Sequence, residues 1–79
     1  MNTANDEKLA KEAHEEVVEC VGICKENGKK ELNFFLPYDF TEMAATLLQG
    51  LLEKDGYQVA IKSFPTRIGR AYIVHVKIQ

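Results

Sequence analysis

Two cysteines and a histidine near the N-terminus are the first side chains whose types and spacing suggest chemistry. Cys20 and Cys24 lie four residues apart, which is one turn of a helix, so their thiolates would supply two of the four ligands that zinc usually takes. His14 precedes Cys20 by six residues and would point away from both thiols, and no Cys-x-x-Cys pair is present. We therefore interpret the cysteines as small buried hydrophobic residues in a reducing compartment, and we predict no metal and no cofactor.

The remaining patterns do not favour catalysis. A nucleophilic cysteine needs an exposed, electropositive thiol, whereas Cys20 and Cys24 lie in an acidic segment. Ser63 is the only serine and lacks a Gly-x-Ser-x-Gly setting, and the five glycines are not spaced to hold a phosphate. Neighbouring acids such as Glu15 and Glu16 fit the solvated side of a helix. We predict that the chain is not an enzyme.

A basic segment near the C-terminus suggests a different kind of chemistry. Lys62, Arg67 and Arg70 surround a predicted loop, with Phe64 and Tyr72 nearby. Cations interleaved with aromatic rings can hold single-stranded nucleic acid, and the same composition is typical of protein–protein hot spots. The pI of 5.6 and the lack of a recognisable RNA-binding motif argue against nucleic acid. Nucleic-acid binding through Lys62, Arg67 and Arg70 therefore stays as the alternative.

Two helices are predicted to position these residues. The first runs from about Asp6 to Glu26, capped by Asn5 or Asp6 and ended by Asn27-Gly28, after a frayed tail over residues 1–4. The second starts near Asp39, whose spacing from Glu42 fits a capping box, and ends at Asp55-Gly56. Tyr38 and Met43 stand at the positions of a hydrophobic staple around this cap. Their apolar stripes are Leu9, Ala13, Val17, Cys20, Val21 and Cys24 in the first and Met43, Leu47, Leu48, Leu51 and Leu52 in the second. Gly50 interrupts the second stripe, and a close approach of helix to sheet would explain it.

Three strands complete the fold. Alternating apolar residues predict strands over about 30–36 and 57–62 and from about 71 to 78, with the last two joined by the loop Phe64–Gly69. The last strand is the most apolar, so we place it in the centre. The sequence thus predicts an α+β fold of order α-β-α-β-β, with a three-stranded mixed sheet of order 1-3-2 and both helices on one face. The side chains facing the helices are Leu32, Phe34, Leu36, Val59, Ile61, Tyr72, Val74 and Val76.

The other face of this sheet, which we call the open face, has no predicted layer to cover it. It carries Asn33, Phe35, Gln58, Ala60, Lys62, Ala71, Ile73 and His75. An exposed, partly apolar patch is a candidate contact surface. It is also consistent with ordinary surface composition, because apolar atoms contribute more than half of a typical protein surface. A homodimer through this face or through an exposed edge strand is the simplest functional interpretation.

Length and composition limit what the chain can be. Seventy-nine residues form one small domain with a modest core, and 46% hydrophobic and 28% charged residues are typical of a folded protein. No apolar run reaches the roughly 18 residues of a membrane span, and the polar N-terminus does not look like a secretory signal. We expect a cytoplasmic protein with no membrane partner. Net charge is −2, with the acids concentrated in residues 1–28.

The layout of the chain resembles that of small accessory proteins encoded in bacteriophage and prophage genomes. The matching features are an acidic N-terminal helix, the Gly28-Lys29 turn, a short strand, a helix ending at Gly56-Tyr57 and a terminal hairpin. The resemblance implies stoichiometric action on a host or phage protein, including inhibition of defence systems.

The leading hypothesis is therefore a non-enzymatic protein–protein interaction module that self-associates or binds another protein. Its candidate contact residues are Phe35, Ile73 and His75 on the open face and Phe64, Arg67 and Arg70 at the loop. A small metal protein or enzyme is the third hypothesis.

Overall fold

The computed structural model describes residues 3–37 and 39–78. Its elements follow the predicted order: α1 (Thr3–Glu26), β1 (Glu31–Phe35), α2 (Glu42–Lys54), β2 (Gln58–Thr66) and β3 (Gly69–Lys77). The α+β fold is confirmed.

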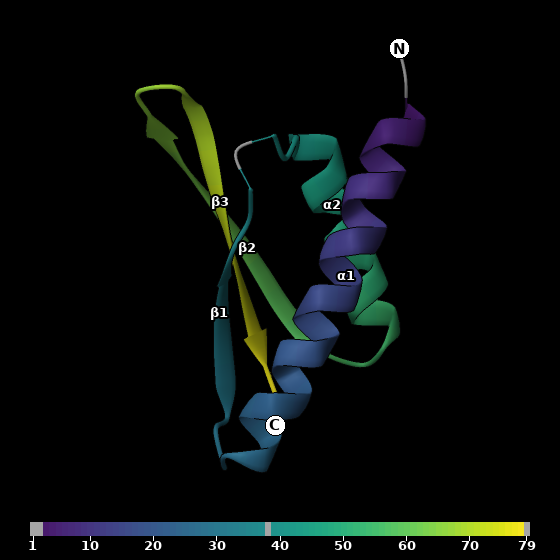
Figure 1. Ribbon diagram of the computed structural model, residues 1–79, viewed down its shortest axis with the longest axis vertical. Coiled ribbons are helices and arrows are strands. Elements are labelled where there is room, and N and C mark those ends of the chain that lie inside the picture. Colours follow the sequence, from purple (N-terminus) through teal and green to yellow (C-terminus); the bar gives the residue numbers. More distant parts are fainter. Residues whose placement is uncertain (1–2, 38, 79) are drawn as a thin grey trace.

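The sheet has the order β1-β3-β2, so the last strand lies in the centre as predicted. Both hydrogen-bonded pairs are antiparallel, and the sheet is therefore antiparallel rather than mixed. The two outer strands run in the same direction but do not pair with each other (Figure 1). The ladder between β1 and β3 gains one bond beyond each end of β1, because Leu36 N donates to Tyr72 O and Ile78 N donates to Lys30 O.

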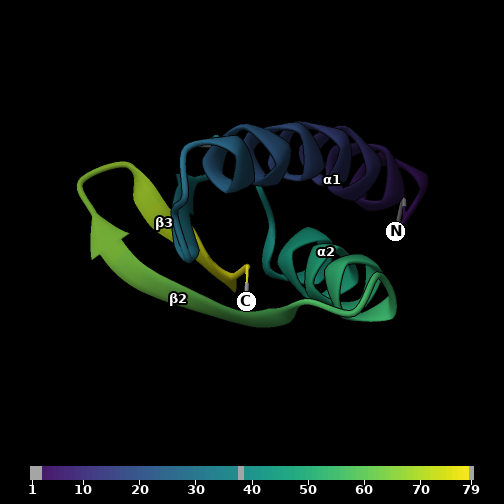
Figure 2. The same cartoon turned by 90° about the horizontal axis from the view of Figure 1, so that it is seen from below.

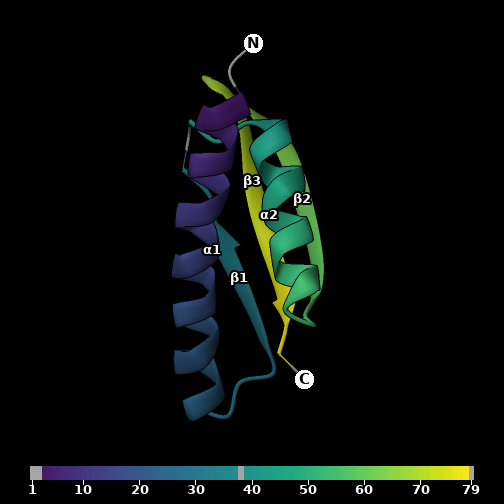
Figure 3. The same ribbon diagram turned by 90° about the vertical axis from the view of Figure 1, so that its right-hand side faces the viewer.

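Both helices cover the same face of the sheet (Figure 2). They lie side by side, with α1 over β1 and α2 over β2 (Figure 3). The core lies between the two layers, and the eight strand residues predicted to face the helices all belong to it or pack against it. From the helices, the buried side chains are Ala10, Ala13, Val17, Val21, Ala44, Ala45, Leu48 and Leu52. Cys20, Cys24 and Leu9 are only half-buried at the margin of this core.

The start of α1 differs from the prediction. Thr3 and Ala4 are helical rather than frayed, while residues 1–2 lie outside the described residues. Asn5 and Asp6 are consequently inside the helix and do not cap it. The Asp6 carboxylate instead accepts a hydrogen bond from the hydroxyl of Thr41, at 2.7 Å, which joins α1 to the beginning of α2.

The start of α2 also differs. Thr41, not Asp39, is the N-cap: its backbone is extended and its Oγ1 accepts a hydrogen bond from Ala44 N at 3.0 Å. The N-cap lies two residues later than predicted, and Met43, which was assigned to the buried stripe, is 52% exposed. The proposed staple between Tyr38 and Met43 is not tested, since Tyr38 lies outside the described residues.

Both helices end where glycine was predicted to end them. Gly28 and Gly56 have φ values of 75° and 95°, which favour glycine over any residue with a Cβ. In each case the next residue donates a hydrogen bond back into the last turn, from Lys29 N to Cys24 O and from Tyr57 N to Leu52 O. This is the Schellman arrangement. Neither helix, within the described part of the chain, has the length and apolar character required to cross a membrane.

The hairpin is tighter than predicted. Thr66 pairs with Gly69, so the loop consists only of Arg67 and Ile68, and Phe64 and Pro65 belong to β2. Pro65 is tolerated because β2 is an edge strand, where a missing N–H costs no ladder bond. The end of the hairpin bends away from the helix layer (Figure 1).

Candidate functional site

The open face is assembled from alternate residues of all three strands. The register places Asn33, His75 and Ala60 in one row across the sheet and Phe35, Ile73 and Lys62 in the next row. These six side chains line a shallow concavity of about 430 Å³. Most of the residues predicted to share this face are thereby brought together, and no helix covers them (Figure 2).

An apolar strip runs diagonally across the open face. It comprises Phe35, Ile73, Ala71 and Phe64, because Ile73 pairs with Phe35 and Ala71 pairs with Phe64. Phe35 is 68% exposed and Phe64 is 38% exposed. Phe64 was predicted to lie in a loop, but the short turn brings it onto β2 and into this strip.

A hydrogen-bonded pair of a histidine and a carboxylate lies at one end of the same face. The imidazole Nε2 of His75 donates to Glu31 Oε1 over 2.6 Å, and Lys77 is the cross-strand neighbour of Glu31. The hydrogen bond from His75, and then its charge, hold the pKa of Glu31 below the ordinary value of 4.5; Lys77 adds to this effect, and partial desolvation opposes it. Glu31 was not among the residues predicted for this face, although its alternation with Asn33 and Phe35 assigns it there.

The three basic residues of the nucleic-acid alternative do not converge. Lys62 lies on the open face and Arg67 lies in the loop. Arg70 points to the opposite side of the hairpin, where its guanidinium donates to the Ser63 hydroxyl at 2.9 Å. The two-residue turn fixes the register of the hairpin, in which Lys62 pairs with Ile73 and Arg70 pairs with Pro65. Because side chains alternate along a strand, Lys62 and Arg70 lie on opposite sides of the hairpin.

The residues considered for metal or thiol chemistry are also separated. Cys20 and Cys24 are free thiols on α1, while His14 Nε2 lies 2.6 Å from Asp55 Oδ2 at the end of α2. His75 belongs to the open face, on the other side of the sheet. Over residues 3–37 and 39–78, no three His, Cys, Asp or Glu side chains gather in a way that would hold a metal ion.

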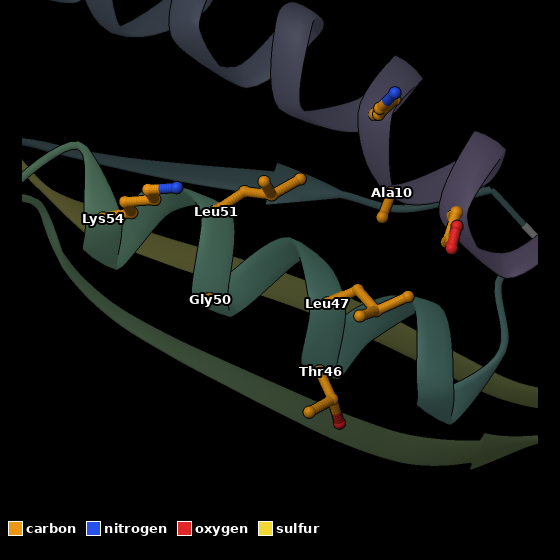
Figure 4. A pocket seen from close by; sticks show the side chains of 8 residues that line it. Ala10, Thr46, Leu47, Gly50, Leu51 and Lys54 are labelled. Carbon is orange, nitrogen blue, oxygen red and sulfur yellow. The ribbon is translucent and has the colours of Figure 1, made fainter.

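A second concavity, which sequence analysis missed, lies between the two helices (Figure 4). It is a groove of about 360 Å³ with Ala10, Leu47 and Leu51 as its apolar lining. Its other lining residues are Glu7, Lys11, Thr46, Gly50 and Lys54. A close approach of α2 to the sheet was the predicted reason for Gly50. That prediction is wrong, because a Cβ at this position would meet no atom within 4 Å.

Comparison of the chain with models of protein families, with curated proteins and with solved structures found no match. The function is therefore inferred from the side chains of the open face and of the helix layer.

Proposed function

We propose that this chain is a small protein–protein interaction module, not an enzyme, that self-associates through its open face. The observation that carries the proposal is the apolar strip, whose four side chains lie together on a sheet face that neither helix covers. Burying such a strip against a second copy removes apolar surface from water, which is the main driving force of association. A two-fold dimer uses one patch twice and therefore needs no second binding surface.

The area of the open face determines how strong the self-association is expected to be. Three strands about 4.8 Å apart, with a central strand of nine residues rising about 3.3 Å each, give a footprint of about 400 Å² per copy. Stable complexes bury about 1,200 Å² or more in total. We therefore expect weak association that depends on concentration, and the same patch would also suit a different protein partner.

A stoichiometric role agrees with the resemblance to small phage and prophage accessory proteins. We place this role in the cytoplasm, because Cys20 and Cys24 carry free thiols and disulfides are rare in reducing compartments. The contact residues in this proposal are Phe35, Ile73 and Phe64, with His75 at the margin.

The test is the solution mass, measured by light scattering over a range of protein concentrations. We expect the mass to rise with concentration for the natural chain and to remain that of a monomer for Ile73→Asp and for Phe35→Asp. Two variants are used because Ile73 lies on the central strand, where Asp carries a folding cost, whereas Phe35 is at the end of an edge strand.

Ile68→Asp is the matched control. Among the residues that the structure describes, Ile68 is the most exposed large apolar residue, at 72%, but it lies in the loop rather than on the strip. Its replacement should leave the mass unchanged, and circular dichroism should show all three variants folded. A chain that stays monomeric at every concentration, or an Ile68→Asp variant that dissociates as fully as Ile73→Asp, contradicts self-association through the open face.

A further inference from the structure

The two layers of the molecule carry opposite charge. The helices α1 and α2 hold nine of the twelve acidic residues of the chain. The hairpin formed by β2 and β3 contains Lys62, Arg67, Arg70 and Lys77 and has no Asp or Glu. The net charge of −2 therefore conceals a positively charged sheet layer, which was not evident from the pI.

The cations of the sheet layer lie beside exposed aromatic rings. Phe35 and Phe64 are both on the open face, on the two outer strands, with Lys62 two residues from Phe64 along β2. Strand spacing and rise place the two phenylalanine Cα atoms about 12 Å apart. Lys77 lies on the same face, and Arg67 lies in the loop at the end of the hairpin.

Among the residues that the structure describes, Glu31 is the acid of the open face, and its carboxylate has partners. Glu31 accepts the 2.6 Å hydrogen bond from His75 and has Lys77 as its cross-strand neighbour. The other polar side chains of this face include the amides of Asn33 and Gln58, which can donate to and accept from the edges of bases. The face therefore combines cations, rings and amides on one surface.

We propose that the open face binds single-stranded nucleic acid. Phe35 and Phe64 stack on bases, while Lys62, Lys77 and Arg67 contact phosphates. Aromatic stacking combined with a cationic surface is the general means by which proteins hold single strands without strict sequence preference. The phosphates of a single strand complement the cations and its bases match the exposed rings, whereas the acidic helix layer of a second copy offers charge without bases and an apolar ligand offers no charge.

This site differs from the basic loop considered in the sequence. Arg70 is excluded because it binds Ser63 on the opposite side of the hairpin. The inference also goes beyond self-association and does not depend on it. Because both would use the open face, an oligonucleotide and a second copy exclude each other, and the oligonucleotide should dissociate any dimer that forms there.

The experiment measures fluorescence anisotropy of a labelled oligothymidylate or oligouridylate on titration with the intact chain. Three phosphate contacts predict about a 20-fold loss of affinity between 50 and 200 mM salt, from the single-strand slope of about −0.7 per contact. Phe35→Ala and Phe64→Ala should each weaken binding by about fivefold or more, since each removes a stacking partner.

A matched pair of double variants distinguishes binding at the open face from a nonspecific effect of the total positive charge. Lys62→Gln with Lys77→Gln should weaken binding strongly and flatten the salt dependence, whereas Lys11→Gln with Lys54→Gln removes the same charge from the helix layer and should change little. All of these positions are exposed on the surface, so we expect the variants to fold.

Absence of binding at 50 mM salt overturns the inference, and so does an equal loss in the two double variants. Light scattering without oligonucleotide tests self-association separately. A chain that self-associates but does not bind the oligonucleotide refutes only this inference, and a monomer that binds it refutes only the proposed dimer.

Discussion

At the scale of single residues, the sequence predicted the face on which His75 lies but not its hydrogen-bond partner, Glu31. Alternation along β3 placed His75 on the open face, and the structure agrees. Its hydrogen bond to Glu31 joins residues 44 positions apart and depends on the register between β1 and β3. Local pattern carries no information about that register, so the partner of His75 was not predicted.

The pKa of Glu31 provides the residue-scale prediction. The carboxyl carbon of Glu31, followed by NMR, should titrate with a midpoint below 4.5, and His75→Gln should move the midpoint back towards 4.5. Lys77→Gln should produce a smaller upward shift, because Lys77 is the weakest of the causes. Since folding lowers this pKa, the carboxylate contributes stability above 4.5 that is lost as pH falls through the folded-state value. A midpoint that His75→Gln leaves in place would disprove this assignment.

At the scale of elements, the ends of the helices were predicted unequally. The C-terminal ends at Gly28 and Gly56 were located correctly, because a positive φ requires glycine whatever surrounds it. The N-terminal end of α2 was misplaced, since Asp39 and Thr41 are both good capping residues. Contact with Asp6 of the neighbouring helix accompanies the choice of Thr41. Propensity narrowed the boundary to a few residues, and packing selected one of them.

Gly50, which lies within α2, and Gly56, which follows its C-terminal end, should respond in opposite ways to substitution by alanine. Gly56→Ala should destabilise the fold by about 1–2 kcal/mol, because φ is 95° and a Cβ is strained there. Gly50→Ala should stabilise it by up to about 1 kcal/mol, because Gly50 is helical and a Cβ would meet no atom within 4 Å. Urea denaturation measures both changes. The same sign for the two variants would be inconsistent with these backbone assignments.

At the scale of the whole molecule, one layer of helices covers one face of a thin sheet. The overall extents are 40 × 26 × 16 Å, and the core lies entirely between the two layers. Such an arrangement supports one core only, and it leaves the open face and the end of the hairpin without a covering layer (Figures 1 and 2). The charge difference between the layers follows from the same architecture, because the acidic helices lie on one side of the sheet.

The core should dominate stability, and two adjacent leucines test this. Leu48 has no exposed surface, and Leu48→Ala should cost about 2–5 kcal/mol. Leu47 is half-buried beside the groove between the helices, and Leu47→Ala should cost less than about 2 kcal/mol. Free energies of unfolding from urea titration decide between them. Equal losses would indicate that the groove is packed as tightly as the core.

The sequence by itself determined the features that depend on local chemistry. Hydrophobic periodicity predicted the number, type and order of the elements, and the alternation of polar and apolar residues assigned Phe35, Ile73 and Lys62 to one face. The strongly apolar last strand correctly predicted the central position of β3. These inferences hold because a strand reverses its side chains at every residue, whatever lies around it.

Only the tertiary structure decided which distant residues meet. The two-residue turn moved Phe64 onto the open face and Arg70 away from it, and register joined His75 to Glu31. The parallel placement of the helices created the groove around Gly50. Each of these outcomes depends on contacts between segments far apart in the chain. The net free energies of such contacts are small differences between large opposing contributions, and a local sequence pattern does not encode them.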